Sequence, residues 1–281
     1  MNPQGQILLA AVLAGIVAIA VTVAIEKFGG IIGGILGTIP TTIVPAAAFM
    51  WLADPTDAAF QPAMGMVPVG MLLNAIFLWL WRAVPPRIPD WNFGNRLSAI
   101  TAINLSVWFA GAAISVTLFS EQSSITVGFA ALLIGVFLGL WITLEHRDAP
   151  RGKNTVGPFT LAMRGVAAAT AIGIAVWLSQ LGSPLLAGIA SVFPAIFLTS
   201  MVALWIAQGE AVPSGAVGPM MLGAMSVSFY ALLATYMLPE FGIVLGSAIT
   251  WFASIAVISV PASFWLRFRA NRRIEAENPA P

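Results

Sequence analysis

Long apolar runs alternate with short polar or charged segments along the whole chain. A run of about 20 apolar residues is long enough to cross a bilayer as a helix. The pattern therefore predicts an all-α, multi-pass membrane protein with nine crossings. Their expected bounds are 7–26, 30–52, 60–81, 98–119, 124–144, 159–179, 182–206, 214–238 and 241–265.

Composition supports the same class of protein. The 281 residues are 59% hydrophobic and 8% charged, whereas soluble domains carry about 25% charged residues. We expect a first membrane half at 1–145, a basic cytoplasmic loop at 146–158, a second membrane half at 159–266 and a basic cytoplasmic tail at 267–281. Because no basic residue precedes Lys27, the first crossing does not resemble a cleaved signal peptide.

The charged residues fall into two sets of loops if there are nine crossings. One set holds the basic residues Lys27, Arg82, Arg87, Arg96, Arg147, Arg151, Lys153, Arg267, Arg269, Arg272 and Arg273. Arg164 lies one turn inside the sixth crossing, and its long side chain is expected to reach back toward that side. The opposite set holds Asp54, Asp57, Glu121 and Glu240. The positive-inside rule then predicts an outside N-terminus and a cytoplasmic C-terminus in a plasma membrane, such as a bacterial inner membrane.

One spacing occurs twice in the chain. Gly34-x5-Pro40-x10-Trp51 recurs as Gly188-x5-Pro194-x10-Trp205, 154 residues later. The copies fall in the second and seventh crossings, which run in opposite directions. We therefore expect an inverted repeat, with crossings 1–4 matching crossings 6–9 and the fifth as a linker. Such a repeat allows two related conformations, open to opposite sides.

The two prolines predict broken helices, because proline removes a backbone hydrogen bond within the bilayer. In the first copy we expect a second half-helix to start at Pro40, with Thr38 as its cap. The free N–H groups at its start would suit an anionic or dipolar solute. The predicted binding residues are Thr38, Pro40, Thr41, Thr42, Asn74, Ser191, Pro194 and Ser226. The alternative is that the glycine-rich faces only pack helices together.

Two carboxylates are candidate gates. Glu26 and Glu210 lie at the expected inner ends of the first and seventh crossings. Residues 208–219 are loop-like yet carry a single charge, so the segment suits either a re-entrant loop or a short turn.

Aromatic and glycine positions predict further contacts. Seven tryptophans fall near expected crossing ends, as in an interfacial aromatic belt: Trp51, Trp79, Trp81, Trp141, Trp177, Trp205 and Trp265. The Gly135-x3-Gly139 motif is typical of helix packing and also suits a homodimer contact.

Catalysis is disfavoured by the residues that are missing. The chain has no cysteine, a single histidine and no HExxH or Gly-x-Ser-x-Gly motif, so we expect no enzyme activity, metal site, cofactor or nucleic-acid partner. The expected function is a permease, or secondary transporter, that moves a small solute or ion by alternating access, with the lipid bilayer as its other partner. The alternatives are a non-catalytic membrane subunit, a lipid-handling protein or a channel.

Overall fold

The computed structural model describes residues 3–28, 39–53, 59–144, 157–208 and 211–277, in which every regular element is a helix. A short 3-10 turn, η1 (Pro85–Arg87), and a π-helix, η2 (Ile255–Ser259), join longer helices. The α-helices are α1 (Pro3–Phe28), α3 (Ile43–Ala53), α4 (Phe60–Ala83), α5 (Phe93–Leu118), α6 (Ser124–Leu144), α7 (Pro158–Gln180), α8 (Pro184–Ala190), α9 (Ala195–Gln208), α10 (Ala211–Ser254) and α11 (Val260–Glu277).

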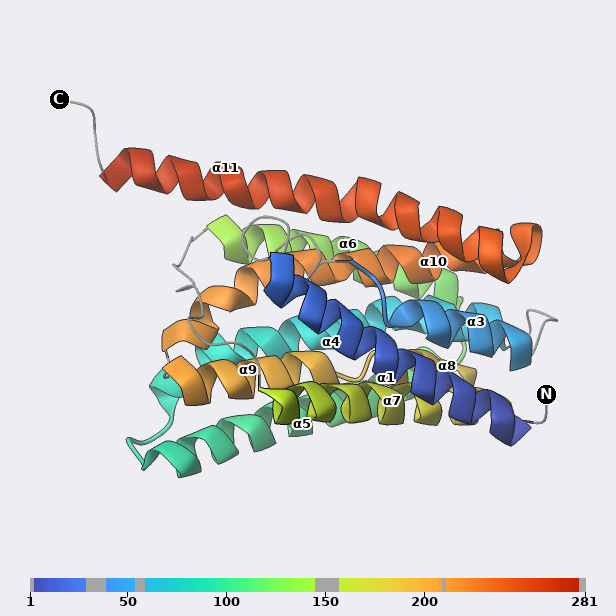
Figure 1. Cartoon of the computed structure of the whole chain (residues 1–281), viewed down its shortest axis with the longest axis horizontal. Coiled ribbons are helices and arrows are strands. Elements are labelled where there is room, and N and C mark those ends of the chain that lie inside the picture. Colours follow the sequence, from blue (N-terminus) through green and yellow to red (C-terminus); the bar gives the residue numbers. More distant parts are fainter. Residues whose placement is uncertain (1–2, 29–38, 54–58, 145–156, 209–210, 278–281) are drawn as a thin grey trace.

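Seven described segments are long and apolar enough to cross a membrane, which confirms a multi-pass membrane protein as the general class. The last of these segments, Gly215–Arg272, is 58 residues long. It reverses at Gly242, whose backbone φ of 73° suits glycine, so α11 runs back beside α10 (Figure 1). The count of nine stays a prediction, because part of the expected crossing 30–52 lies outside the described residues.

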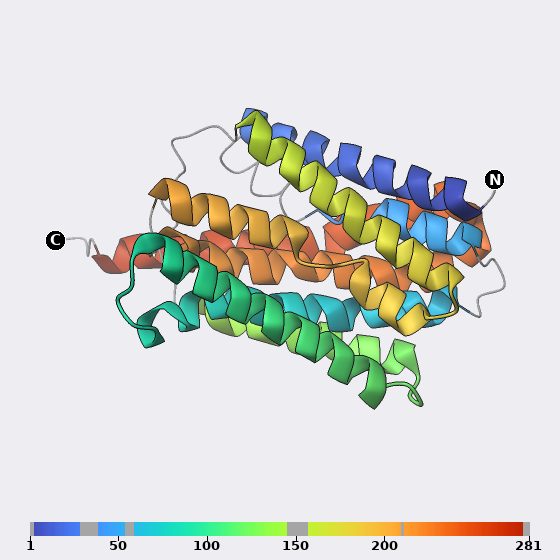
Figure 2. The ribbon, with the colours of Figure 1, turned by 90° about the horizontal axis from the view of Figure 1, so that it is seen from below.

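Apart from Arg164, the charged residues of the described helices lie near helix ends, and these helix ends lie at the two ends of the bundle (Figures 1 and 2). The ends of α4, α6 and α11 and the start of α5 share one end, which carries the arginines. Glu121 and Glu240 lie beside the turns at the opposite end. The predicted sidedness as a whole stays a prediction, because Asp54, Asp57, Arg147, Arg151 and Lys153 lie outside the described residues.

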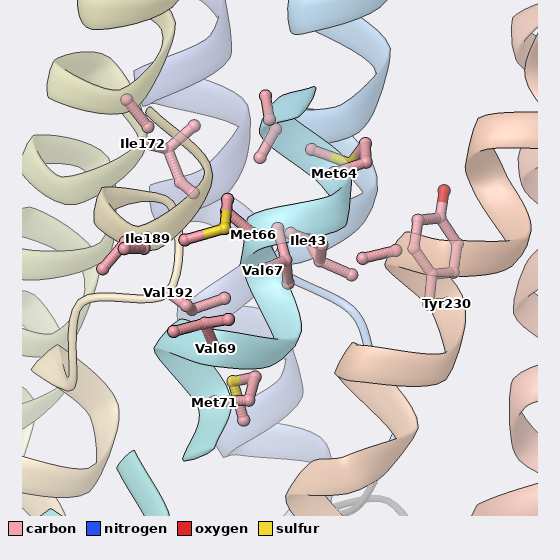
Figure 3. Close-up of a cluster of buried hydrophobic side chains, with 14 of the residues drawn as sticks. Ile43, Met64, Met66, Val67, Val69, Met71, Ile172, Ile189, Val192 and Tyr230 are labelled. Carbon is pink, nitrogen blue, oxygen red and sulfur yellow. The ribbon is translucent and has the colours of Figure 1, made fainter. Parts of the chain in front are cut away.

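Helix α4 forms the centre of the bundle. In its apolar window 72% of the residues are buried, against 28% in those of α5 and α6. Figure 3 shows methionine and valine side chains of α4 pointing toward α3, α8 and α10. Among them, Met64 and Met66 are fully buried, and their flexible side chains fill the irregular space between these helices.

Two tryptophans are not part of an interfacial belt. Trp81 and Trp205 are 0% and 1% exposed, and their rings meet edge to face at 5.9 Å in the core. Trp79, Trp141 and Trp177 are well exposed near helix ends, as an aromatic belt requires. The prediction of an interfacial position is therefore wrong for Trp81 and Trp205.

Glycines allow several helices to touch backbone to backbone. A Cβ added to Gly128 on α6 would lie 2.2 Å from the carbonyl oxygen of Gly65 on α4. On α1, a Cβ added to Gly15 would lie 3.0 Å from the carbonyl oxygen of Gly165 on α7. Such close approaches are typical of membrane helix packing.

The Gly135-x3-Gly139 motif packs within the chain. An added Cβ would lie 2.3 Å from Met225 Sδ at Gly135 and 2.9 Å from Leu222 Cα at Gly139. Both glycines therefore face α10, and the predicted use of this motif as a homodimer contact is wrong.

Two local predictions also differ from the structure. Helix α5 begins at Phe93 rather than at residue 98, because the Asn92 side chain accepts a hydrogen bond from the Asn95 amide at 2.9 Å and caps it. Helix α10 begins at Ala211, so residues 211–219 form no re-entrant loop. Pro213 is tolerated there because the first turn of a helix needs no partner for its N–H.

Replacing Gly128 with alanine should lower the free energy of unfolding by about 2–3 kcal/mol, because α4 and α6 must separate to admit a methyl group. Thermal unfolding of the purified protein measures this loss. The control is Gly94→Ala in the exposed first turn of α5, where the nearest atom to an added Cβ is 3.9 Å away. Equal stability of the two variants would contradict the close α4–α6 contact.

Candidate functional site

The predicted crossing 182–206 is interrupted at its middle. Helix α8 ends at Ala190 and α9 begins at Ala195, leaving 191–194 between them. Pro194 explains the interruption, because it lacks an N–H and disfavours helical geometry in the residue before it. Ser191 donates its hydroxyl to the Gly188 carbonyl oxygen at 2.7 Å, which ends α8 locally.

One amide side chain holds this break in place. Asn74 of α4 is 1% exposed and donates from Nδ2 to the Val192 carbonyl oxygen at 2.7 Å. Its Oδ1 accepts a hydrogen bond from Nε1 of Trp108 on α5 at 2.8 Å. Asn74 therefore satisfies a carbonyl in the break and is itself oriented by a second helix.

The break is also closely packed. A Cβ on Gly188 would lie 1.9 Å from the Ala63 carbonyl oxygen, and one on Gly70 would lie 2.5 Å from a methyl group of Val192. Phe193 packs edge to face on Trp108, with the ring centroids 5.2 Å apart. Helix α8 and the break thus lie directly on α4 in this conformation (Figure 3).

Near the predicted break at Pro40, the following helix begins later than the sequence predicts. The half-helix α3 begins at Ile43, three residues later than the predicted start at Pro40, because the Thr41 amide closes a tight turn on the Ile39 carbonyl oxygen at 2.9 Å. Pro40 is buried, whereas Thr41 and Thr42 are partly exposed. Thr38 lies outside the described residues, so its capping role stays a prediction.

The structure places α3 against α10, on which the candidate Ser226 lies. Ser226 is fully buried. Ile43, at the start of α3, belongs to the same buried hydrophobic cluster as Tyr230 of α10 and Val67 of α4 (Figure 3). The structure thus places 191–194 on α4 and α3 on α10, so each of these segments lies on a long helix from the other half of the chain.

The two candidate gates remain predictions. Glu26 lies in the last turn of α1, but the structure does not describe its side chain. Glu210 lies outside the described residues.

Two polar side chains near the break have buried polar atoms without a partner among the described residues. Both side-chain atoms of Asn104 on α5 and Nε1 of Trp81 on α4 are in this state. Helices α4 and α5 are antiparallel (Figure 2). Along these helices, toward the arginine-rich end of the bundle, Trp81 lies about 10 Å and Asn104 about 6 Å from the Asn74–Trp108 contact. Unpaired buried polar groups are costly and are typical of sites that hold water or a ligand.

Arg164 points inward rather than back toward the end of the bundle. Its Nη2 donates to the Ser200 hydroxyl on α9 at 3.0 Å, so the predicted outward orientation is wrong. A cation inside a membrane segment is a candidate functional residue by default. The sequence signal for this role is its position within the apolar run 159–179.

The chemistry of this region is hydrogen bonding. Around the break lie two amides, a hydroxyl and an indole N–H group, from Asn74, Asn104, Ser191 and Trp108. The guanidinium of Arg164 contacts Ser200 further along α9. In the described ranges no group of three histidine, aspartate or glutamate side chains is placed to hold a metal ion. These groups suit the recognition of a small polar solute.

Comparisons with known proteins add no assignment: no family model, curated protein or solved structure matches the chain. The fold itself defines the class, a polytopic α-helical membrane protein with an interrupted apolar segment near its centre.

Replacing Asn74 with leucine should lower the free energy of unfolding by about 2–5 kcal/mol, since the Val192 carbonyl and the Trp108 N–H would both lose their partner. Trp108→Phe removes only one of the two hydrogen bonds and should cost less. The double variant should be less destabilised than the sum of the single changes, as measured by thermal unfolding. Strict additivity would show that the two side chains do not act together.

Proposed function

We propose that this protein is a permease that moves a small solute or ion across a membrane by alternating access. The observation that carries the proposal is the break at 191–194, which lies on α4. Asn104, about one helical turn from Trp108, adds a buried amide without a described partner. Interrupted helices near the bilayer midplane are the usual location of a transporter's binding site. The proposal involves no catalysis and no cofactor.

The proposed architecture has nine crossings in two inverted halves, although no repeat is detected in the described structure. Helix pairing supports it. An offset of five crossings exchanges α1 with α7 and α4 with α10, and each of these pairs is in contact. The same offset turns the contact of α10 with α3 into that of α4 with α9, and both occur. In addition, α3 and α9 run toward opposite ends of the bundle (Figure 1).

The proposed orientation places the arginine-rich end in the cytoplasm and the N-terminus outside, in a plasma membrane. The binding site would combine Pro40, Thr41 and Thr42 with Asn74, Ser191, Pro194 and Ser226, as the sequence predicts, and would add Asn104. Arg164 lies on the cytoplasmic side of the break and would attract an anionic solute. Thr38, Glu26 and Glu210 keep their proposed roles as cap and gates.

The close packing of the break favours a second candidate. Glycines at 65, 70, 128 and 188 interlock the helices, as they would in a membrane subunit that only packs against partners. Transport requires α8 to separate from α4 so that water reaches the break. A packing subunit requires no such opening, and solvent access therefore distinguishes the two.

Introduced cysteines should test this opening, since the chain has no cysteine of its own. We expect Ser191→Cys and Thr42→Cys to react with a membrane-impermeant thiol reagent, because an aqueous pathway reaches both in one of the two conformations. The measurement is the labelled fraction in intact cells and in inverted vesicles. Phe137→Cys on the exposed face of α6 is the lipid-facing control and should stay unlabelled.

Two further controls report the orientation. Gln122→Cys, at the turn after α5, should react only from outside, and Arg272→Cys only from the cytoplasmic side. If the cysteines at 191 and 42 stay as protected as the one at 137, the water-accessible site is wrong and the packing subunit is favoured.

Replacing Asn104 with leucine should raise thermal stability, by about 1 kcal/mol, because it removes a buried amide without a described partner. The same change should abolish any rise in melting temperature that an ion or metabolite produces in the wild type, since a bound solute stabilises the folded state. Thr117→Val, on an exposed position of α5, is the control and should alter neither. A full ligand response in the leucine variant would remove Asn104 from the site.

A further inference from the structure

A groove separate from the break lies where α4 and α6 end, at the arginine-rich end of the bundle. Its volume is about 390 Å³, and we call it the basic groove. It is lined by Trp79, Arg82, Ala83, Arg87, Trp141, Ile142 and Leu144. None of these lining residues carries an acidic group.

Arginines bring positive charge to the groove from three elements. Arg82 lies in the last turn of α4 and Arg87 in η1, and both line the groove. Arg269 of α11 donates to the carbonyl oxygen of Leu144, a third lining residue, and its guanidinium lies 5.9 Å from the ring centre of Trp265. The groove is therefore bordered by three guanidinium groups.

Helix ends here would by themselves repel an anion, since the carbonyl groups of α4 and α6 point out of their C-termini. The arginines offset this effect directly. Arg87 donates to the Ala83 carbonyl oxygen, and Arg269 donates to that of Leu144. A guanidinium has five N–H donors, and the hydrogen bonds to these two carbonyl oxygens use one donor of Arg87 and one of Arg269. Donors therefore remain for an anionic ligand after the helix ends are capped.

The surroundings of the groove match a lipid rather than a free ion. Trp79 and Trp141 are 41% and 57% exposed, as expected of indoles at a membrane interface. Leu133 and Phe137 precede Trp141 at four-residue intervals on the same face of α6 and are 56% and 67% exposed. This apolar stripe leads from the groove along the bundle, where an acyl chain would lie.

We propose that the basic groove binds the phosphate headgroup of an anionic phospholipid, with an acyl chain along the α6 stripe. Basic pockets between helices on the cytoplasmic side are suited to such headgroups. The leaflet follows from the orientation proposed above, but binding itself depends only on the groove. Failure of the solute site would leave this proposal unaffected.

The test compares the purified full-length protein in nanodiscs of neutral phosphatidylcholine with nanodiscs that also contain phosphatidylglycerol. Native mass spectrometry of the released protein measures retained lipid, and thermal unfolding measures its stabilising effect. The wild type should retain phosphatidylglycerol and melt at a higher temperature in its presence. Arg82→Gln/Arg87→Gln should weaken binding roughly thirtyfold, taking about 1 kcal/mol for each arginine.

The matched control is Arg267→Gln/Arg272→Gln, which removes the same charge from exposed positions on α11 outside the groove lining. This variant should bind as the wild type does, and Arg82→Lys/Arg87→Lys should restore most binding if the glutamine variant folds poorly. Equal losses in both glutamine variants would overturn the proposal in favour of general surface attraction. If inorganic phosphate alone gives the same stabilisation, the groove is a free-phosphate site instead. If the wild type shows no preference for phosphatidylglycerol, the lipid site is excluded.

Discussion

The arrangement of this bundle depends on one requirement, that a broken helix inside a membrane must still pair its backbone groups. The break at 191–194 exposes the Val192 carbonyl, and Asn74 supplies the missing donor at 2.7 Å. Trp108 then occupies the oxygen of the same amide. A single side chain therefore fixes the relative positions of α4, α5 and the break, and the interrupted segment is stable without water.

Glycine contacts make the same region compact. Gly70 and Gly188 let α8 lie on α4 with little space between them, and Gly65 and Gly128 do the same for α4 and α6. Packing is the main attraction between helices in lipid, because the hydrophobic effect does not favour one apolar partner over another. Helix α4 is consequently held on several sides, whereas the short helix α8 ends at a break. Relative movement should therefore concentrate at 191–194.

The sequence predicts the features that depend on composition along the chain. Long apolar runs, separated charges and the interruption near Pro194 follow from residue type and position. Which side of a helix faces the core is harder to predict, because helices that are apolar all around carry no amphipathic pattern that distinguishes the core side from the lipid side. For this reason the sequence predicts the wrong surroundings for four residues, Trp81, Trp205, Gly135 and Arg164. The hydrogen bond from Asn74 to the Val192 carbonyl oxygen joins residues 118 positions apart, and no local sequence pattern indicates such a contact.

Charge and neutral polarity are distributed in different ways in this protein. The arginines near the ends of α4 and α11 share one end of the bundle. In the proposed orientation they would lie where the membrane meets water and would fix that orientation at low cost. Near the break the polar groups are neutral, apart from Arg164 and its Ser200 partner. Moving a neutral amide or hydroxyl between two pairings requires the exchange of a few hydrogen bonds, each worth about 1 kcal/mol net. An unpaired buried charge would cost far more. In the proposed permease, a neutral interior would therefore keep two conformations close in free energy, which is the condition that alternating access requires.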